Sequence, residues 1–246
     1  MVLEPLEGRI AVALEGHEFD LQDACDSFPP GEGQVGVCKL LIPPNEKCVL
    51  LSNLLNELEN ESEIARMSQR LVDLVNGLLF IENPSRQPIR CQGVRHRQSG
   101  NGNWGVTIAV PTATARARAG KIGLGEQAIP TKQQALMRKA LSDDVVMEVL
   151  TYLRDTPDWF DLYKAYETMK ADLSVRLGKG AQQYVGWPAN KVKIFAEVAN
   201  GVRHGKKSER VREKRDRKSE AVMSLPDARQ FVRELCQLWL ANIRAP

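Results

Sequence analysis

The chain has 246 residues, of which 43% are hydrophobic and 26% are charged, and its formal net charge is only +3. These values are typical of a globular protein with one or two domains, and they argue against a polyanion-binding role for the chain as a whole. Any such role must therefore come from a local cluster of charge.

The cysteines and the apolar runs indicate the compartment. There is no Cys-x-x-Cys pair and the number of cysteines is odd, which argues against a disulfide framework. We expect reduced, mostly buried thiols in a cytoplasmic protein. The start of the sequence does not read as a signal peptide, and no apolar run approaches the ~20 residues that a membrane span needs. The cysteines are Cys25, Cys38, Cys48, Cys91 and Cys236.

The first part of the chain predicts a small α+β domain over residues 1–112, with mostly antiparallel strands and one amphipathic helix. The helix is expected over 62–80, with Ser62 as its N-cap, because apolar residues recur there at spacings of three and four. Two hairpins are expected, one with Pro43, Pro44 and Asn45 in its turn. The predicted strands are 9–15, 35–42, 47–53, 89–97 and 103–110.

Two chemically reactive side chains fall in one of these strands. Cys91 and His96 lie five residues apart, an odd separation that predicts opposite faces of a sheet. This spacing argues against a Cys–His catalytic pair.

The second part of the chain predicts an all-α bundle. Residues 113–130, rich in Ala, Gly and Thr, indicate a linker, and residues 131–246 predict four or five antiparallel helices with a basic loop at 203–223. Helix N-caps are expected where Ser, Thr or Asp precedes an apolar pattern. The expected caps are Thr131 with Gln134, Ser142, Asp158 with Asp161, and Ser224 with Asp227.

The motifs favour neither a metal nor a cofactor. The three histidines are far apart, and none has a second ligand at metal-binding spacing. The glycines of 120–127 match neither the phosphate-binding loop nor the dinucleotide fingerprint. Asp158 and Asp161 are explained by capping, and the neighbouring aromatic residues by core packing.

The segment 203–218 contains nine Lys or Arg residues and three acids. Such a run cannot pack in a core, but it can neutralise the phosphates of a nucleic acid. It contains no aromatic residue, so it offers no surface for base stacking. A solvated connection between helices and a nucleic-acid interface both remain open. The expected nucleic-acid-binding residues are Lys206, Lys207, Arg210, Arg212, Lys214, Arg215, Arg217 and Lys218.

A resemblance is carried by "DWFDLYKAYE", "ANGVRHG" and "LPDARQFVRELCQLWL", within residues 155–240. These segments resemble uncharacterised bacterial proteins with a Tyr/Glu-rich helix and an Asn-then-Arg-His segment. More distantly, the bundle is similar to the HEPN superfamily, whose helical domains often dimerise and in many cases cut RNA without a metal. The HEPN motif is Arg, often followed by Asn, with His five to seven residues after the Arg. Asn200 and His204 fit that motif, whereas Ala199 occupies the Arg position, so Arg203 would have to supply the cation.

The leading functional hypothesis is a non-enzymatic binding or accessory protein of a bacterial intracellular system. It would self-associate or join a protein partner, would not engage a membrane, and would contact RNA or DNA through 203–218. The alternative, implied by the resemblance, is a metal-independent endoribonuclease of a defence or toxin-type system. Its catalytic residues would be Asn200, Arg203 and His204, with Glu167 and Tyr163 as supporting polar groups.

Overall fold

The computed structural model describes residues 10–31, 34–42, 45–97, 104–109, 131–203 and 223–243. The chain divides into two compact units. Unit 1 comprises residues 1–78 and 87–142, and unit 2 comprises 79–86 and 143–246. No helix in the described part of the chain combines the length and the apolar character needed to cross a bilayer.

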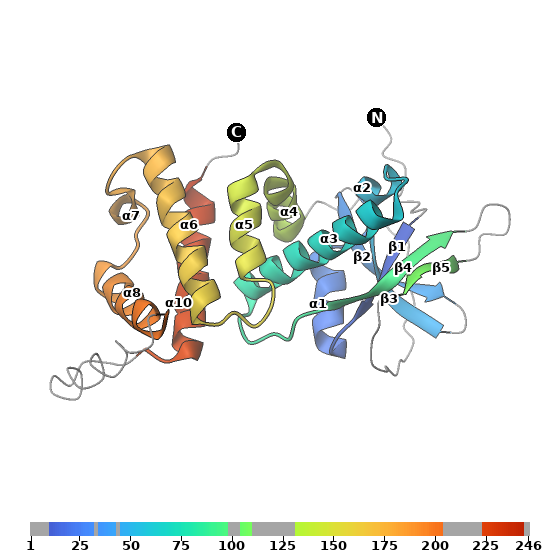
Figure 1. The fold of residues 1–246 in the computed structure, drawn as a ribbon, viewed down its shortest axis with the longest axis horizontal. Helices are drawn as coiled ribbons and strands as arrows, with labels where there is room; N and C mark the ends of the chain where they lie inside the picture. Colours follow the sequence, from blue (N-terminus) through green and yellow to red (C-terminus); the bar gives the residue numbers. More distant parts are fainter. Residues whose placement is uncertain are drawn as a thin grey trace. The chain divides into compact units, whose positions relative to one another are not determined.

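Unit 1 contains a five-stranded antiparallel sheet with the strand order β2-β3-β1-β4-β5 (Figure 1). β1 is the central strand, and Ile10, Ala11, Val12 and Ala13 are each at most 3% exposed, so both of its faces are covered. The predicted α+β class and its antiparallel strands are confirmed. The strands are β1 (Ile10–Glu15), β2 (Val35–Ile42), β3 (Asn45–Ser52), β4 (Arg90–Arg97) and β5 (Trp104–Ala109).

The register of β4 corrects the expectation for Cys91 and His96. Cys91 lies opposite Leu14 and His96 lies opposite Ile10, while the register shifts between Ala13 and Leu14. Leu14 and Ile10 are four residues apart on β1 and therefore share a face. The prediction of opposite faces was wrong because the irregularity adds one residue to β4 between Cys91 and Gly93. Beyond that residue, the side chains of β4 alternate between the two faces in the reverse order.

Four helices accompany the sheet. They are α1 (Glu18–Ser27), α2 (Asn53–Asn56), α3 (Glu61–Glu82, of which 79–82 belong to unit 2) and α4 (Lys132–Ser142). The expected long helix is confirmed as α3, but Ser62 does not cap it. Asn60 does, because its side-chain oxygen accepts hydrogen bonds from the backbone of Ser62 and Glu63.

Helix α4 belongs to unit 1, which differs from the predicted boundary at residue 131. The Thr131 hydroxyl donates a hydrogen bond to the carbonyl of Ser27, and the Gln134 amide donates one to the carbonyl of Pro29. α4 also contacts α1. These polar contacts connect residues about a hundred positions apart, so the local pattern of the sequence could not predict them. The predicted linker, 113–130, lies outside the described residues.

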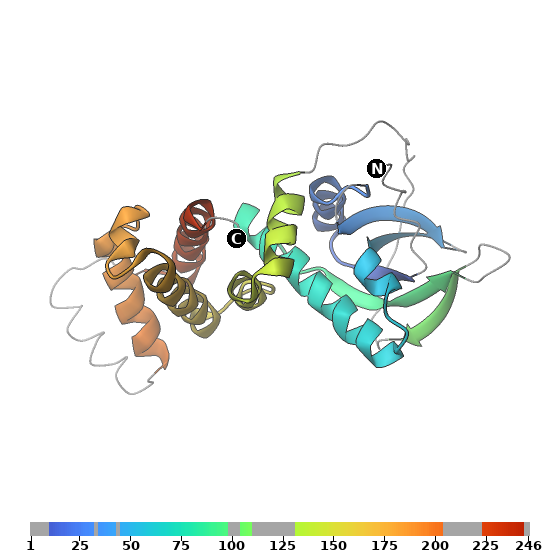
Figure 2. The same cartoon turned by 90° about the horizontal axis from the view of Figure 1, so that it is seen from above.

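Unit 2 is helical, as expected. Among the described helices of this unit, the longest is α6, which contacts the other four and runs alongside α8 and α10 (Figure 2). The helices are α5 (Asp144–Tyr152), α6 (Trp159–Leu177), α7 (Ala181–Tyr184), α8 (Ala189–Arg203) and α10 (Leu225–Asn242).

Most of the expected N-caps are confirmed. Asp158 with Asp161 and Ser224 with Asp227 form complete capping boxes, and the Thr131 hydroxyl accepts a hydrogen bond from the Gln134 backbone. Ser142 was the wrong cap for α5. Asp143 is the N-cap, since its carboxylate accepts hydrogen bonds from the backbone of the second and third residues of the first turn.

A buried polar network connects three helices of unit 2. Asp172 on α6 accepts hydrogen bonds from the indole of Trp239 on α10, at 2.9 Å, and from the guanidinium of Arg176, at 2.6 Å. Arg176 also bonds to Asp143 at the start of α5, at 2.7 Å. Trp239 is fully buried and Asp172 is 7% exposed, so these two groups rely on their protein partners, whereas Arg176 is exposed.

Candidate functional site

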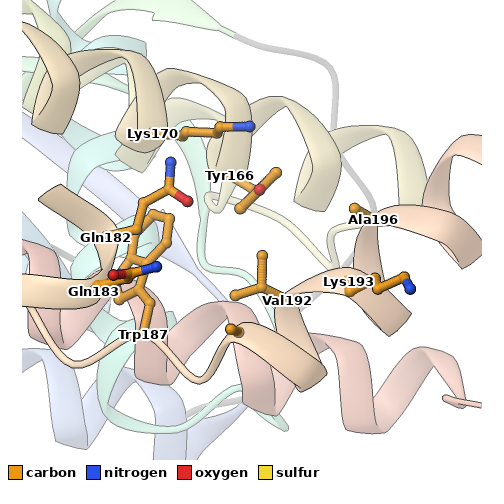
Figure 3. A pocket seen from close by; sticks show the side chains of 9 residues that line it. Tyr166, Lys170, Gln182, Gln183, Trp187, Val192, Lys193 and Ala196 are labelled. Atoms are coloured by element: carbon orange, nitrogen blue, oxygen red, sulfur yellow. The ribbon is translucent and has the colours of Figure 1, made fainter. Parts of the chain in front are cut away.

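A cavity of about 260 Å³ opens in unit 2 among α6, α7 and α8 (Figure 3). It is close to the lower limit of the volumes that hold small-molecule ligands, which start at about 300 Å³. Its lining joins aromatic, amide and cationic side chains. The described lining residues are Tyr166, Lys170, Gln182, Gln183, Trp187, Ala189, Val192, Lys193 and Ala196.

The chain forms this cavity by turning sharply between α6 and α8. Gly178, Gly180 and Gly186 have backbone φ angles of +89°, +81° and +78°, a backbone conformation that residues other than glycine rarely adopt. The backbone N–H of Trp187 then donates a hydrogen bond to the carbonyl of Gln182, and α8 begins directly after Pro188. The turn thus brings α7 and Trp187 against α6.

Two aromatic residues form a firm wall of the cavity. Tyr166 and Trp187 are each only 4% exposed, and their ring centroids lie 5.8 Å apart. Phe195 of α8 packs edge-on against Tyr166, at 5.6 Å. Burial raises the pKa of the Tyr166 hydroxyl, and the neighbouring Tyr163 and Glu167 raise it further. The phenol is therefore neutral at physiological pH and can both donate and accept hydrogen bonds.

The indole of Trp187 has an unused donor. Its Nε1 atom is buried and has no hydrogen-bond partner among the described residues. A buried N–H without an acceptor costs free energy of the order of 1–3 kcal/mol.

The charge of the lining is positive. Lys170 and Lys193 contribute two cations, and none of the described lining residues is Asp or Glu. The Lys170 amine lies 5.8 Å from the centroid of the Tyr166 ring. In Figure 3 the Lys193 amine points away from the other lining side chains, so it lies at the rim of the cavity. The cavity therefore favours a ligand that carries negative charge or oxygen acceptors.

The ionisable side chains of the described lining are Tyr166, Lys170 and Lys193. The described lining contains no His, Cys, Ser, Asp or Glu, the residue types that most often act as nucleophiles or general bases. Within the described ranges, no three or more His, Cys, Asp or Glu residues are grouped so that they could hold a metal ion.

Part of the set predicted to be catalytic or supporting lies within the described residues. Asn200 is exposed on α8, and Arg203 is the last residue of that helix. Tyr163 packs against Tyr166 with 6.0 Å between the ring centroids, and Glu167 pairs with Lys164 at 3.8 Å. Asn200, Tyr163 and Glu167 do not line the cavity. His204, the side chain of Arg203 and the basic residues from Lys206 to Lys218 lie outside the described part of the structure.

Ala199 occupies the position that the resemblance assigns to a catalytic arginine. It is only 1% exposed and lies inside the helical core.

Sequence reasoning missed the cavity residues Lys170, Gln182, Gln183, Trp187 and Lys193. A signal was available in "GKGAQQYVGWPAN", residues 178–190, where three glycines and a proline frame two glutamines and a tryptophan. This pattern of glycines and proline indicates a constrained turn, and a large aromatic residue in such a turn is expected to pack against a neighbouring element.

The chain matches no protein-family model, no curated protein and no solved structure.

Proposed function

We propose that this protein is a non-enzymatic, nucleic-acid-binding accessory protein that acts in the bacterial cytoplasm. The observation that supports this proposal best is the course of α8. Lys193 at the cavity rim and Asn200 lie seven residues apart on one face, and the helix leads directly into the basic segment that starts at Arg203. One helix therefore connects two sources of positive charge.

The basic segment would supply most of the binding free energy. Its nine Lys and Arg residues against three acids can neutralise several phosphates and release their counterions. This kind of attraction is independent of base sequence and weakens steeply as salt rises. It fits a protein that holds RNA or DNA in place for partner proteins.

The cavity would add a contact that the basic segment lacks. Amide side chains such as those of Gln182 and Gln183 can hydrogen-bond to the edge of an unpaired base. We therefore expect single-stranded nucleic acid to bind more tightly than a duplex, whose base edges are already paired.

The decisive experiment measures the affinity for labelled single-stranded RNA and DNA by fluorescence anisotropy at several salt concentrations. Replacing the eight Lys and Arg residues of 206–218 by Gln should remove most of the affinity at about 50 mM salt and flatten its salt dependence. Affinity that survives this replacement unchanged would contradict the proposal.

A smaller change tests the cavity alone. The double variant Lys170→Gln/Lys193→Gln should lower the slope of log affinity against log salt by about one to two. The matched control is Lys191→Gln, an exposed lysine on the same helix that does not line the cavity. Equal effects of the cavity variant and the control would restrict binding to the basic segment.

Labelled RNA should stay uncut throughout these measurements. Cleavage that the His204→Ala substitution abolishes would instead favour the ribonuclease hypothesis.

A further inference from the structure

Two thiols of unit 1 face each other. The Sγ atoms of Cys25 on α1 and Cys48 on β3 lie 3.6 Å apart, although the residues are 23 positions apart in the sequence. Both cysteines are free. A disulfide bond needs a separation of about 2.05 Å, so the two sulfurs would have to approach by roughly 1.5 Å.

The environments of the two sulfurs differ. Cys25 is partly exposed, whereas Cys48 is only 8% exposed. A hydrogen bond from the Cys48 thiol lowers the pKa of Cys25, and Lys39 of β2 lowers it further, against burial and the nearby Asp26. The same hydrogen bond, together with burial, raises the pKa of Cys48. Cys25 is therefore the more accessible and the more readily ionised thiol of the pair.

A third cysteine nearby is set apart by the sheet. Lys39 lies opposite Cys48 in the β2–β3 register, whereas Cys38 lies opposite Val49. Since neighbouring residues of a strand alternate between faces, Cys38 and Cys48 occupy opposite faces of the sheet. Cys38 packs against Ala11 and Val49, and burial raises its pKa to about 11. Cys38 thus serves as an internal control.

We propose that Cys25 and Cys48 form a reversible redox modification site that responds to hydroperoxides. The Cys25 thiolate attacks the terminal oxygen of the peroxide, the O–O bond breaks, and the alcohol leaves after taking up a proton. Cys25 is then a sulfenic acid. The Cys48 sulfur attacks the Cys25 sulfur, water leaves, and the Cys25–Cys48 disulfide forms. In total, two thiols and one hydroperoxide give one disulfide, one alcohol and one water, and a dithiol reductant reverses the oxidation.

The site is independent of the proposed nucleic-acid contact, because all of its residues belong to unit 1. Oxidation would tie α1 covalently to β3, next to the central strand. The geometry explains why this pair, among the five cysteines, should respond: it combines short separation, access for a small oxidant and one activated sulfur.

The test treats the full-length protein with hydrogen peroxide, blocks the remaining thiols, and maps the cross-link by mass spectrometry without reduction. Trypsin alone leaves Cys25 and Cys38 on one peptide, because there is no Lys or Arg between Arg9 and Lys39. A second protease that cleaves after Glu32 separates them. We expect a peptide with Cys25 linked to Cys48, and its loss on treatment with dithiothreitol.

Single-residue variants assign the roles. In Cys48→Ser, a dimedone probe should trap a sulfenic acid at Cys25, while Cys25→Ser should show neither probe labelling nor a cross-link. Cys38→Ser should form the disulfide at the wild-type rate. Failure to find the Cys25–Cys48 cross-link, or a cross-link that uses Cys38 instead, would overturn the proposal. Unchanged circular dichroism of each variant excludes misfolding as the cause of any loss.

Discussion

The two units join their elements in different ways. In unit 1 the strands are connected by backbone hydrogen bonds, and the core around them is mainly aliphatic. In unit 2 each helix satisfies its backbone internally, so side chains must determine which helices meet. Aromatic rings and the Asp172 network have this role. A sheet is specified largely by register, whereas a bundle needs directional side chains, and one of these, Tyr166, also lines the cavity.

The strongest test of this contrast is Asp172→Ala in unit 2. The change leaves the indole N–H of Trp239 without an acceptor and removes one partner of Arg176. Because the buried indole N–H loses its acceptor and a partly exposed ion pair is also broken, we expect a loss of about 3 kcal/mol in the free energy of unfolding. Urea unfolding followed by tryptophan fluorescence measures it. The control Asp155→Ala breaks an exposed ion pair with Arg154 and should cost under ~1 kcal/mol. Similar losses in the two variants would contradict the structural role of the network.

In unit 1 the matching change is Asn76→Ala. The Asn76 side chain accepts a hydrogen bond from the backbone N–H of Ile89, at 2.9 Å, and donates one to its carbonyl, at 2.7 Å. We expect a loss of about 2 kcal/mol, because two buried backbone groups lose their partner. Hydrogen exchange should show faster exchange at the Ile89 amide. Gln69→Ala, on the same helix but exposed, should leave that amide protected.

The smallest expected effect concerns the cap of α10. Hydrogen bonds from the side chain and the backbone N–H of Ser224 lower the pKa of Asp227 below its usual 3.8. The folded state therefore favours the charged carboxylate of Asp227. The stability that this preference contributes is complete at pH values above the pKa of the unfolded chain, and it is lost as the pH falls through the lower pKa of the folded state. Asp227→Asn should remove this part of the acid dependence of stability, as measured by thermal unfolding at a series of pH values. An unchanged acid profile would show that the cap does not persist in solution.

Much of the fold could be predicted because it is encoded locally. The β2–β3 hairpin follows from two apolar runs around a proline turn, and α3 follows from its apolar spacing. α1 was missed because only Asp20 and Ala24 of its ten residues are buried, so it has no apolar stripe. The face of His96 was predicted wrongly because a register shift leaves no trace in composition.

The candidate site was less accessible to sequence reasoning. Asn200, Arg203 and His204 attracted attention through their spacing, whereas the cavity depends on how α6 and α8 meet after the turn at 178–188. The pairing of Cys25 with Cys48 likewise depends on tertiary placement, since neither residue belongs to a recognisable motif. Contacts between different helices and strands determine where both sites form, whereas the spacing of apolar residues in the sequence gives information only about neighbours within one helix or strand.

The division of α3 between the units has a practical consequence for dissecting the protein. The Ile81 carbonyl, in the last turn of that helix, accepts hydrogen bonds from Arg233 at 2.7 Å and from Gln237 at 3.0 Å, all within unit 2. A fragment that starts at Asp143 would lack this acceptor and expose the side of α10 that it covers. Neither unit can therefore be excised by a single cut in the gene. During synthesis, the segment 79–86 leaves the ribosome long before the helix that binds it, so unit 2 can close only after α10 has been made.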